Sequence, residues 1–310
     1  MENAPERGET AARQAAGGGL AAALVSYAIW GMMPIYWAGT APALPLEVLS
    51  HRIVWAVAFI GAALLITGRG RALAAASRAL VRDPRQASLI LAAALFASLN
   101  WLVNILGAHT GRVVELGTGM FLTPLMTVLF GTLFYRERLG GIRLAAVALA
   151  ACGLAVMVFS LGCVPLIALG VSSTWAAYSA VKKSVRVNAV LSTGIEHALM
   201  LPFAAAYLAW LAGSGQGRFL AGDAALSLLL FGTGLVTAIP MVAYSYAAQR
   251  LPLSVLGFVQ YLNPVLTICV GCLALREALG PAQALALAFI VAGVALFAAA
   301  PRMGRKKAYG

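Results

Sequence analysis

The chain reads GTGMFLTPLMTVLFGTLFYRERLGG at residues 117–141, and 140 residues later it reads GFVQYLNPVLTICVGCLALREALGP at residues 257–281. Extended without gaps to residues 155 and 295, the two stretches are identical at 14 of 39 positions. Matched alanines and leucines are common in such a composition, whereas a matched proline, matched glycines and a matched Arg-Glu pair are not. The chain therefore contains an internal repeat.

The composition indicates that this repeat lies in a membrane. Of the 310 residues, 62% are hydrophobic and 10% are charged, and the mean hydropathy is +0.89. A soluble domain carries about a quarter charged residues, and a soluble core of this size could not hide so much apolar surface. The lipid bilayer is the expected solvent, which excludes a cytosolic enzyme, a secreted disulfide scaffold, a disordered chain and a free nucleic-acid-binding protein.

Ten apolar runs are long enough to cross a bilayer, since a spanning helix needs roughly 20 apolar residues. We predict spans at residues 19–38, 46–67, 87–107, 113–135, 141–159, 163–181, 191–212, 223–248, 254–275 and 281–299. Five fall in each copy of the repeat, at 19–160 and 161–300. Because five is odd, the second copy enters the membrane the other way up. The predicted fold is an all-α membrane protein of ten transmembrane helices, arranged as two inverted five-helix repeats.

The positive charges predict the orientation. With the N-terminus inside, 18 of the 22 Lys and Arg residues lie in inner loops or tails and 3 lie in outer loops. Cytoplasmic segments show this bias. Residues 1–18 are polar without the pattern of a cleaved signal, and residues 301–310 are basic. We expect both to be cytosolic tails of a multi-pass inner-membrane protein.

Charged side chains inside a span are costly unless they are paired or hydrated, and they are candidates for function. His51 and Arg52 lie about a turn and a half into their span. One interpretation is an anion or carboxylate contact with Glu47 or Glu115 as resting counter-ion, and the other is a structural ion pair. Glu115 and Glu196 are candidates for carrying a coupling proton, with helix capping as the alternative for Glu115. These five residues are the predicted coupling or gating groups.

Symmetry-related prolines predict a central solute site. Pro124 and Pro264 fall near the middle of their spans, where a proline frees a backbone carbonyl that needs a partner or water. We predict a helix break at both, as in transporters with broken helices; a plain packing kink is the alternative. The candidate solute contacts are aromatic and amide side chains: Trp30, Asn100, Trp101, Tyr178, Tyr244, Gln260, Tyr261 and Asn263.

The sequence offers no pattern for a cofactor. Cys269-x-x-Cys272 has metal or redox spacing, but no second pair or nearby histidine completes a site. We expect core packing for the four cysteines, with no metal and no cofactor. The sequence also shows no Walker loop, so transport would draw on a gradient, with protons as the candidate coupling ion.

Several short motifs follow one another over about residues 19–299. They read Tyr27-x-x-Trp30-Gly31-x-x-Pro34-x-Tyr36, Glu47-x-x-x-His51-Arg52-x-x-Trp55, Asn100-Trp101, Gly119-x-Phe121-x-x-Pro124-Leu125, Lys182-Lys183, Gly234-x-x-Thr237-x-x-Pro240 and Leu256-Gly257-x-x-Gln260-Tyr261-x-x-Pro264. Together they resemble the RarD-type proteins of the EamA group, in the drug/metabolite transporter superfamily. The chain departs from the family pattern at Thr123, where the family has the asparagine that the second copy keeps as Asn263.

This resemblance implies a small-molecule permease, often an exporter. The expected function is secondary transport of small organic solutes or drugs across the cytoplasmic membrane by alternating access. An amino-acid exporter of the same superfamily is the first alternative. An intramembrane enzyme would need a catalytic constellation and a channel a symmetric selectivity element, and the sequence shows neither pattern.

Overall fold

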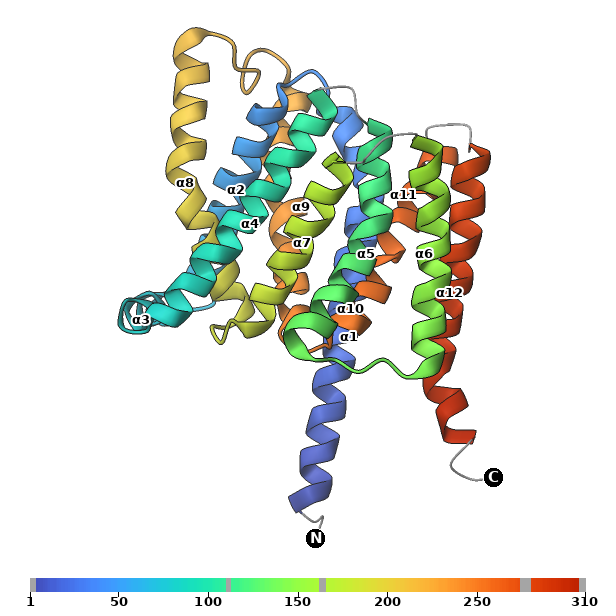
Figure 1. Ribbon diagram of the computed structural model, residues 1–310. Helices are drawn as coiled ribbons and strands as arrows, with labels where there is room; N and C mark the ends of the chain where they lie inside the picture. The colour runs from blue at the N-terminus through green and yellow to red at the C-terminus, as the bar shows by residue number, and fades with distance from the viewer. Residues whose placement is uncertain (1–3, 110–112, 162–165, 274–279, 307–310) are drawn as a thin grey trace. The chain divides into compact units, whose positions relative to one another are not determined.

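The computed structural model describes residues 4–109, 113–161, 166–273 and 280–306, and within these ranges every regular element is a helix (Figure 1). The helices are α1 (Ala4–Gly39), α2 (Pro45–Ile66), α3 (Gly70–Arg82), α4 (Pro84–His109), α5 (Val113–Tyr135), α6 (Gly141–Leu161), α7 (Leu166–Ser184), α8 (Ala189–Ser214), α9 (Ala224–Ala248), α10 (Leu253–Gln260), α11 (Leu262–Leu273) and α12 (Pro281–Lys306). Over the residues that the structure describes, each predicted span coincides with one long helix, or at 254–275 with α10 and α11 together.

Seven helices are long and apolar enough to cross a membrane. Their spanning segments are Ala16–Met33, Pro45–Ile66, Pro84–Asn104, Leu116–Tyr135, Gly141–Ser160, Ala189–Ser214 and Ala224–Ala248. Leu253–Thr267 and Ala284–Ala299 are shorter apolar stretches. The chain is therefore a multi-pass, helical membrane protein over the described residues. The count of ten crossings stays a prediction.

α3 is a helix where the sequence analysis expected only an inner loop. It packs against α2 and α8, and its buried side chain is Leu80. The segment is amphipathic and carries Arg71, Arg78 and Arg82 on its exposed faces. A short helix with one narrow apolar stripe contains no uninterrupted apolar run, so the sequence pattern does not indicate it.

Local signals explain several helix ends. α2 begins with Pro45, whose fixed φ suits the first turn of a helix. Asn188 and Asp223 precede α8 and α9, and their side chains accept backbone N–H groups two and three residues further on, at 3.0 and 2.9 Å. Such caps satisfy donors that have no partner within the helix. α8 is followed by Gly215, whose φ of 68° favours a glycine.

Contacts divide the chain into two compact units that differ from the predicted repeats. The first unit comprises Met1–Ser98 and Val181–Leu251, and the second comprises Leu99–Ala180 and Pro252–Gly310. Each unit contains helices from both predicted halves, 19–160 and 161–300. Those halves rest on sequence similarity and the units on contacts, so the division into units leaves the predicted repeat boundaries untested.

The first unit is organised around α2. This helix packs against α8 and α9, and α9 packs against α1. The approach of α9 to α2 depends on Gly234, because a Cβ there would lie 2.8 Å from the backbone nitrogen of Ala56. Small residues let membrane helices come this close. Near its C-terminal end α2 contacts the start of α8 through Ile60 and Gly194, so these two helices run antiparallel.

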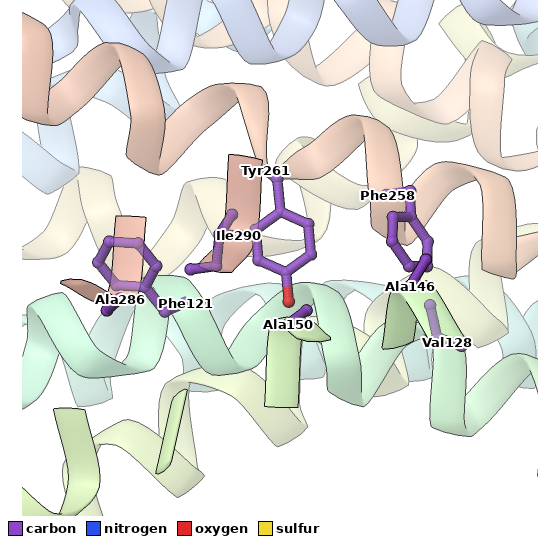
Figure 2. Packing of buried hydrophobic residues seen from close by; sticks show 8 residues of the cluster. All are labelled: Phe121, Val128, Ala146, Ala150, Phe258, Tyr261, Ala286 and Ile290. Carbon is purple, nitrogen blue, oxygen red and sulfur yellow. The ribbon is translucent and has the colours of Figure 1, made fainter. Parts of the chain in front are cut away.

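In the second unit, α6 packs along α12 and α5 packs along α10. The apolar core between these helices is shown in Figure 2 and consists of Phe121, Val128, Ala146, Ala150, Phe258, Tyr261, Ala286 and Ile290. Tyr261 lies between α10 and α11. The core therefore encloses the point at which this helix is interrupted.

The contact between α6 and α12 is reciprocal. A Cβ on Gly153 would lie 2.8 Å from the carbonyl oxygen of Ala286, and a Cβ on Gly293 would lie 2.9 Å from that of Ala146. The two glycines are 140 residues apart, and so are the two alanines. This separation is the offset of the sequence repeat. Each helix thus approaches the backbone of the other through an equivalent glycine.

The expectation of core packing is wrong for two cysteines. Cys152 and Cys269 are free thiols on exposed faces of α6 and α11. In a membrane protein the outer faces of helices are as apolar as the interior, because lipid takes the place of water. An apolar run therefore does not distinguish a buried from a lipid-facing cysteine. Cys163 and the side chain of Cys272 lie outside the described residues.

Candidate functional site

Two predicted solute contacts, Trp30 and Tyr244, lie together in the first unit. Their ring centroids are 5.7 Å apart, and both rings contact Tyr27, at 5.8 and 5.9 Å. Tyr27 and Tyr244 are fully buried, and Trp30 is half-buried. The sequence analysis did not select Tyr27, although its spacing of three residues from Trp30 places both on one helix face. α1 and α9 thus form an aromatic cluster of Tyr27, Trp30 and Tyr244.

Arg52 contacts α1 and α9 at Trp37 and Thr237, seven residues along each helix from Trp30 and Tyr244. Its Nε donates to the Thr237 hydroxyl at 3.1 Å, and its guanidinium lies 5.0 Å from the ring centroid of Trp37. A guanidinium over an aromatic face is attracted to the ring. The hydroxyl on α9 and the ring on α1 hold Arg52 in one orientation, which is a suitable arrangement for recognising an anionic group.

Glu47 and His51 occupy a different face of α2. Glu47 Oε1 accepts hydrogen bonds from the backbone N–H groups of Arg218 and Phe219, at 2.6 and 3.2 Å. His51 Nδ1 accepts from Trp55 Nε1 at 3.2 Å, and the His51 ring lies 4.7 Å from that of Phe219. The hydrogen bonds of Glu47 therefore come from the loop between α8 and α9. Its expected role as counter-ion to Arg52 stays a prediction.

Glu196 forms a buried ion pair. Lys182 Nζ lies 2.6 Å from Glu196 Oε1 and also donates to the Ser192 hydroxyl at 2.8 Å. The exposed fractions of the two charged side chains are 0% and 3%. Lys182, at the end of α7, was absent from the predicted site. Only its place in the Lys182-Lys183 motif could have indicated it, since its partner lies in the next helix.

In the second unit, Asn100 joins α4 to α7. Its Nδ2 donates to the Val171 carbonyl at 2.8 Å and contacts the Thr174 hydroxyl at 3.0 Å. Tyr178 lies on the same helix α7, fully buried, with its ring 5.1 Å from that of Trp175. Trp101 is half-buried on α4. Asn100 and Tyr178 therefore both take part in the packing of α7.

The predicted contacts Gln260, Tyr261 and Asn263 surround the interruption between α10 and α11. Gln260 Oε1 accepts from the Thr127 hydroxyl of α5 at 3.3 Å, and Asn263 Oδ1 accepts from Thr267 at 3.3 Å. The Tyr261 hydroxyl points toward α6 (Figure 2) and has no hydrogen-bond partner among the described residues. Polar atoms without partners are rare in protein interiors, so the interruption is a candidate place for a polar ligand.

The two prolines behave differently. The second copy divides at Tyr261, three residues before Pro264, which lies in the first turn of α11. The break predicted at Pro124 is wrong, because α5 continues through it. Nearby hydroxyls bind helix carbonyls, with Thr123 donating to Gly119 at 2.6 Å and Thr127 to Thr123 at 2.9 Å. Such hydroxyl contacts help a membrane helix to tolerate a proline.

Glu137 has a structural role that the sequence did not reveal. The chain leaves α5 through Arg136, whose φ is 51°. Glu137 then accepts the backbone N–H groups of Leu253 and Ser254 at 2.7 and 2.8 Å. Its carboxylate therefore caps the N-terminus of α10. The side chain of the remaining predicted acid, Glu115, in the first turn of α5, lies outside the described residues.

A cavity of about 410 Å³ lies along α3 and is lined by Ala75, Arg78, Ala79, Arg82 and Asp83. None of the predicted solute contacts lines it. This cavity does not support or change the assignment of the site residues above.

Comparison with known proteins identifies the family. Residues 164–299 match the EamA-like transporter family. The chain is 37% identical to a protein named RarD from Streptomyces exfoliatus over 83% of this chain and 80% of the relative. It is 34% identical to an uncharacterized transporter from Vibrio cholerae, covering 90% and 91%. It is 30% identical to the chloramphenicol-sensitive protein RarD from Pseudomonas aeruginosa, covering 86% and 89%.

The fold has a relative among solved crystal structures. One such chain superposes with a TM-score of 0.69 at 22% identity, covering 90% of this chain and 96% of the other. This likeness shows the fold alone. The similarity in sequence extends over most of the chain and most of each relative, so the chain belongs to the RarD-type group of the EamA-like transporter family.

Proposed function

We propose that this protein is a secondary active transporter that exports small organic solutes or drugs across the cytoplasmic membrane by alternating access. In this proposal ten helices cross the membrane, both termini are cytoplasmic, and residues 19–160 and 161–300 form inverted repeats. Family membership supports a transporter. The structural observation that carries the proposal is the reciprocal contact between α6 and α12.

That contact has the geometry of a two-fold relation. Gly153 approaches Ala286 just as Gly293 approaches Ala146, and the partners differ by the repeat offset. When two equivalent elements are related by a two-fold axis, residue i of one contacts residue j of the other and the reverse contact also forms. An axis in the membrane plane relates inverted repeats in many transporters. The reciprocal contact supports this arrangement for α6 and α12.

The contact between α5 and α10 departs from the same symmetry. A Cβ on Gly257 would lie 2.7 Å from the carbonyl oxygen of Pro124, whereas its counterpart Gly117 has no such neighbour within 4 Å. α5 is continuous, whereas the second copy is interrupted before Pro264. Inverted repeats in a transporter that is open to one side adopt two different conformations and exchange them during the cycle. The asymmetry therefore supports alternating access.

The first unit offers a basis for binding an amphipathic solute. Arg52, oriented by Thr237 and Trp37, would bind an anionic or zwitterionic group, and Tyr27, Trp30 and Tyr244 would bind an aromatic portion. Aromatic side chains bury large apolar groups and keep a polar edge. In the second unit we propose that Gln260, Tyr261 and Asn263 contact solute where the helix is interrupted.

The test is transport by the purified full-length protein in liposomes. Labelled chloramphenicol and labelled phenylalanine are supplied with and without an imposed pH gradient, and efflux from loaded vesicles is measured separately. We expect saturable flux that is stimulated by unlabelled solute on the other side. Arg52→Ala should reduce flux about tenfold, the loss of one charge-assisted contact. Arg186→Ala removes an exposed arginine of the same unit and should have no effect.

Transport of phenylalanine in preference to chloramphenicol would favour the amino-acid exporter. Unchanged flux in Arg52→Ala would remove Arg52 from the solute path. The absence of flux for both compounds would contradict the proposed solute class.

A further inference from the structure

A buried carboxylate on α2 holds the loop between α8 and α9. Glu47 is 1% exposed, and its Oε1 receives the backbone N–H groups of Arg218 and Phe219. Gly217 also passes close to this oxygen, since a Cβ added to Gly217 would lie 3.6 Å from Glu47 Oε1. The docking loop, residues 217–219, thus places two donors on one oxygen of Glu47. Hydrogen bonds to an ionised carboxylate are stronger than those to a neutral acceptor.

The other polar atoms of this site lack partners. Glu47 Oε2 and His51 Nε2 are buried and have no hydrogen bond among the described residues. Because His51 Nδ1 accepts from Trp55, the neutral ring carries its hydrogen on Nε2. One turn of α2 therefore holds an unsatisfied acceptor and an unsatisfied donor, four residues apart and on one face. Such atoms are costly to bury, which indicates that the site takes up something.

The surroundings limit what can bind. The titratable groups near Glu47 are His51 on α2, Tyr207 on α8 and Arg218 in the docking loop. From α9, Leu226 and Leu230 pack with Phe219 in an apolar cluster beside α2. Among the described residues no third His, Cys, Asp or Glu completes a metal site here. A proton is the ligand that a single buried carboxyl with a free oxygen binds most readily.

Proton binding and loop position are therefore linked. With the docking loop in place, the charge on Glu47 is stabilised by two backbone donors and by the N-terminus of α2. If the loop withdraws, those two donors are lost to Glu47. Conversely, a proton on Oε2 removes the charge that attracts the loop.

We propose that Glu47 binds the coupling proton of the transport cycle and that binding of this proton weakens the docking of the 217–219 loop. This rests on the proposed transport function. The proton passes between Glu47 Oε2 and solvent, and His51 Nε2–H is a hydrogen-bond donor one turn away for the ionised state. Glu196 is not equivalent, because Lys182 neutralises its charge at 2.6 Å.

The experiment follows loop position without requiring solute. The reporter is Gly217→Cys, whose Cβ would lie 3.6 Å from Glu47 Oε1 with the loop docked, in a chain whose four native cysteines are replaced by alanine. Its rate of labelling by an impermeant maleimide is measured. The same measurement on a Ser214→Cys variant, at an exposed position, corrects for the pH dependence of thiol reactivity. We expect the corrected rate to rise about threefold or more when the pH is lowered from about 8 to about 5.

Glu47→Gln keeps the size and an acceptor oxygen but cannot ionise, so its corrected rate should not vary with pH. Glu47→Asp retains an acid and should retain a pH dependence. Arg218→Ala leaves the backbone N–H in place and should behave as the parent chain. A pH response that persists in Glu47→Gln, or its absence from the parent chain, would overturn the proposal.

A second measurement separates this proposal from the transport function. In liposomes, Glu47→Gln should lose flux driven by a pH gradient while it keeps exchange of labelled for unlabelled chloramphenicol, because exchange moves no net proton. Gradient-driven flux that is equal in Glu47→Gln and the parent chain would overturn the coupling role. Absence of all flux together with a Glu47-dependent loop response would instead count against the proposed solute class alone.

Discussion

Gly153 meets Ala286 with no side chain between them, since a Cβ on this glycine would lie 2.8 Å from the alanine carbonyl oxygen. Gly293 meets Ala146 in the same manner at 2.9 Å. In lipid the association of helices depends on packing rather than on a hydrophobic force between them. These two contacts are therefore expected to carry much of the association of α6 with α12.

Replacing either glycine by alanine should weaken this contact. Gly153→Ala and Gly293→Ala introduce a methyl group against backbone, and overpacking of this kind costs about 1–3 kcal/mol. Gly61→Ala on α2 is the matched control, because its Cβ position has no neighbour within 4 Å. There the helix propensity of alanine should leave stability unchanged or raise it by up to about 1 kcal/mol. Thermal unfolding in detergent measures all three, and equal effects at all three sites would contradict the argument.

The next pair of glycines tests the asymmetry between α5 and α10. Gly257→Ala places a methyl group 2.7 Å from the Pro124 carbonyl oxygen, while Gly117→Ala places one in open space. We expect Gly257→Ala to destabilise the described conformation by about 1–3 kcal/mol and Gly117→Ala to change stability by less than about 0.5 kcal/mol. If the two copies exchange conformations, both variants should nevertheless slow transport. Stability by thermal unfolding and flux in liposomes provide the two readouts.

Much of the fold could be predicted because the length of each apolar run and the offset of the repeat can be read directly from the sequence. The ten apolar runs coincide with helices, and the offset of 140 residues recurs in the Gly153 and Gly293 contacts. The different behaviour of Pro124 and Pro264 could not be predicted. Each proline removes one backbone donor from its helix. Contacts with neighbouring helices therefore decide which of the two helices divides.

The candidate site was predictable for single residues but not for their partners. Glu47, Arg52 and Glu196 are conspicuous because charges are rare within spans. Their contacts, however, come from segments 14 to 185 residues away, as with Thr237 for Arg52 and Lys182 for Glu196. Glu137 was not among the candidate residues, because the helix it caps begins 116 residues later.

Removing the cap on α10 should loosen the start of that helix. Glu137→Ala leaves the N–H groups of Leu253 and Ser254 without their acceptor, and loss of an N-terminal cap costs about 0.5–2 kcal/mol. Arg138→Ala removes an exposed neighbour and should have little effect. Hydrogen exchange of the first turn of α10 measures the change directly. Unaltered exchange in Glu137→Ala would show that water or another group caps this helix equally well.

The buried pair of Lys182 and Glu196 should be strongly coupled. Lys182→Met leaves the carboxylate buried without its cation, and Glu196→Gln leaves the ammonium without its anion. Removal of one partner of a buried pair costs about 3–5 kcal/mol, mainly because the remaining charge stays buried. The double variant removes both charges and should be more stable than either single variant. Thermal unfolding of the four proteins completes the double-mutant cycle.

The sign of that cycle separates two roles for the pair. A double variant more stable than both single variants would show that each charge is retained because of the other, and the pair could then be removed with little cost to the fold. If that variant also transports solute at the parental rate, Glu196 is structural and not a coupling group. Loss of transport in a stable double variant would instead place the pair in the transport cycle. Additive destabilisation would contradict the coupling expected from a separation of 2.6 Å.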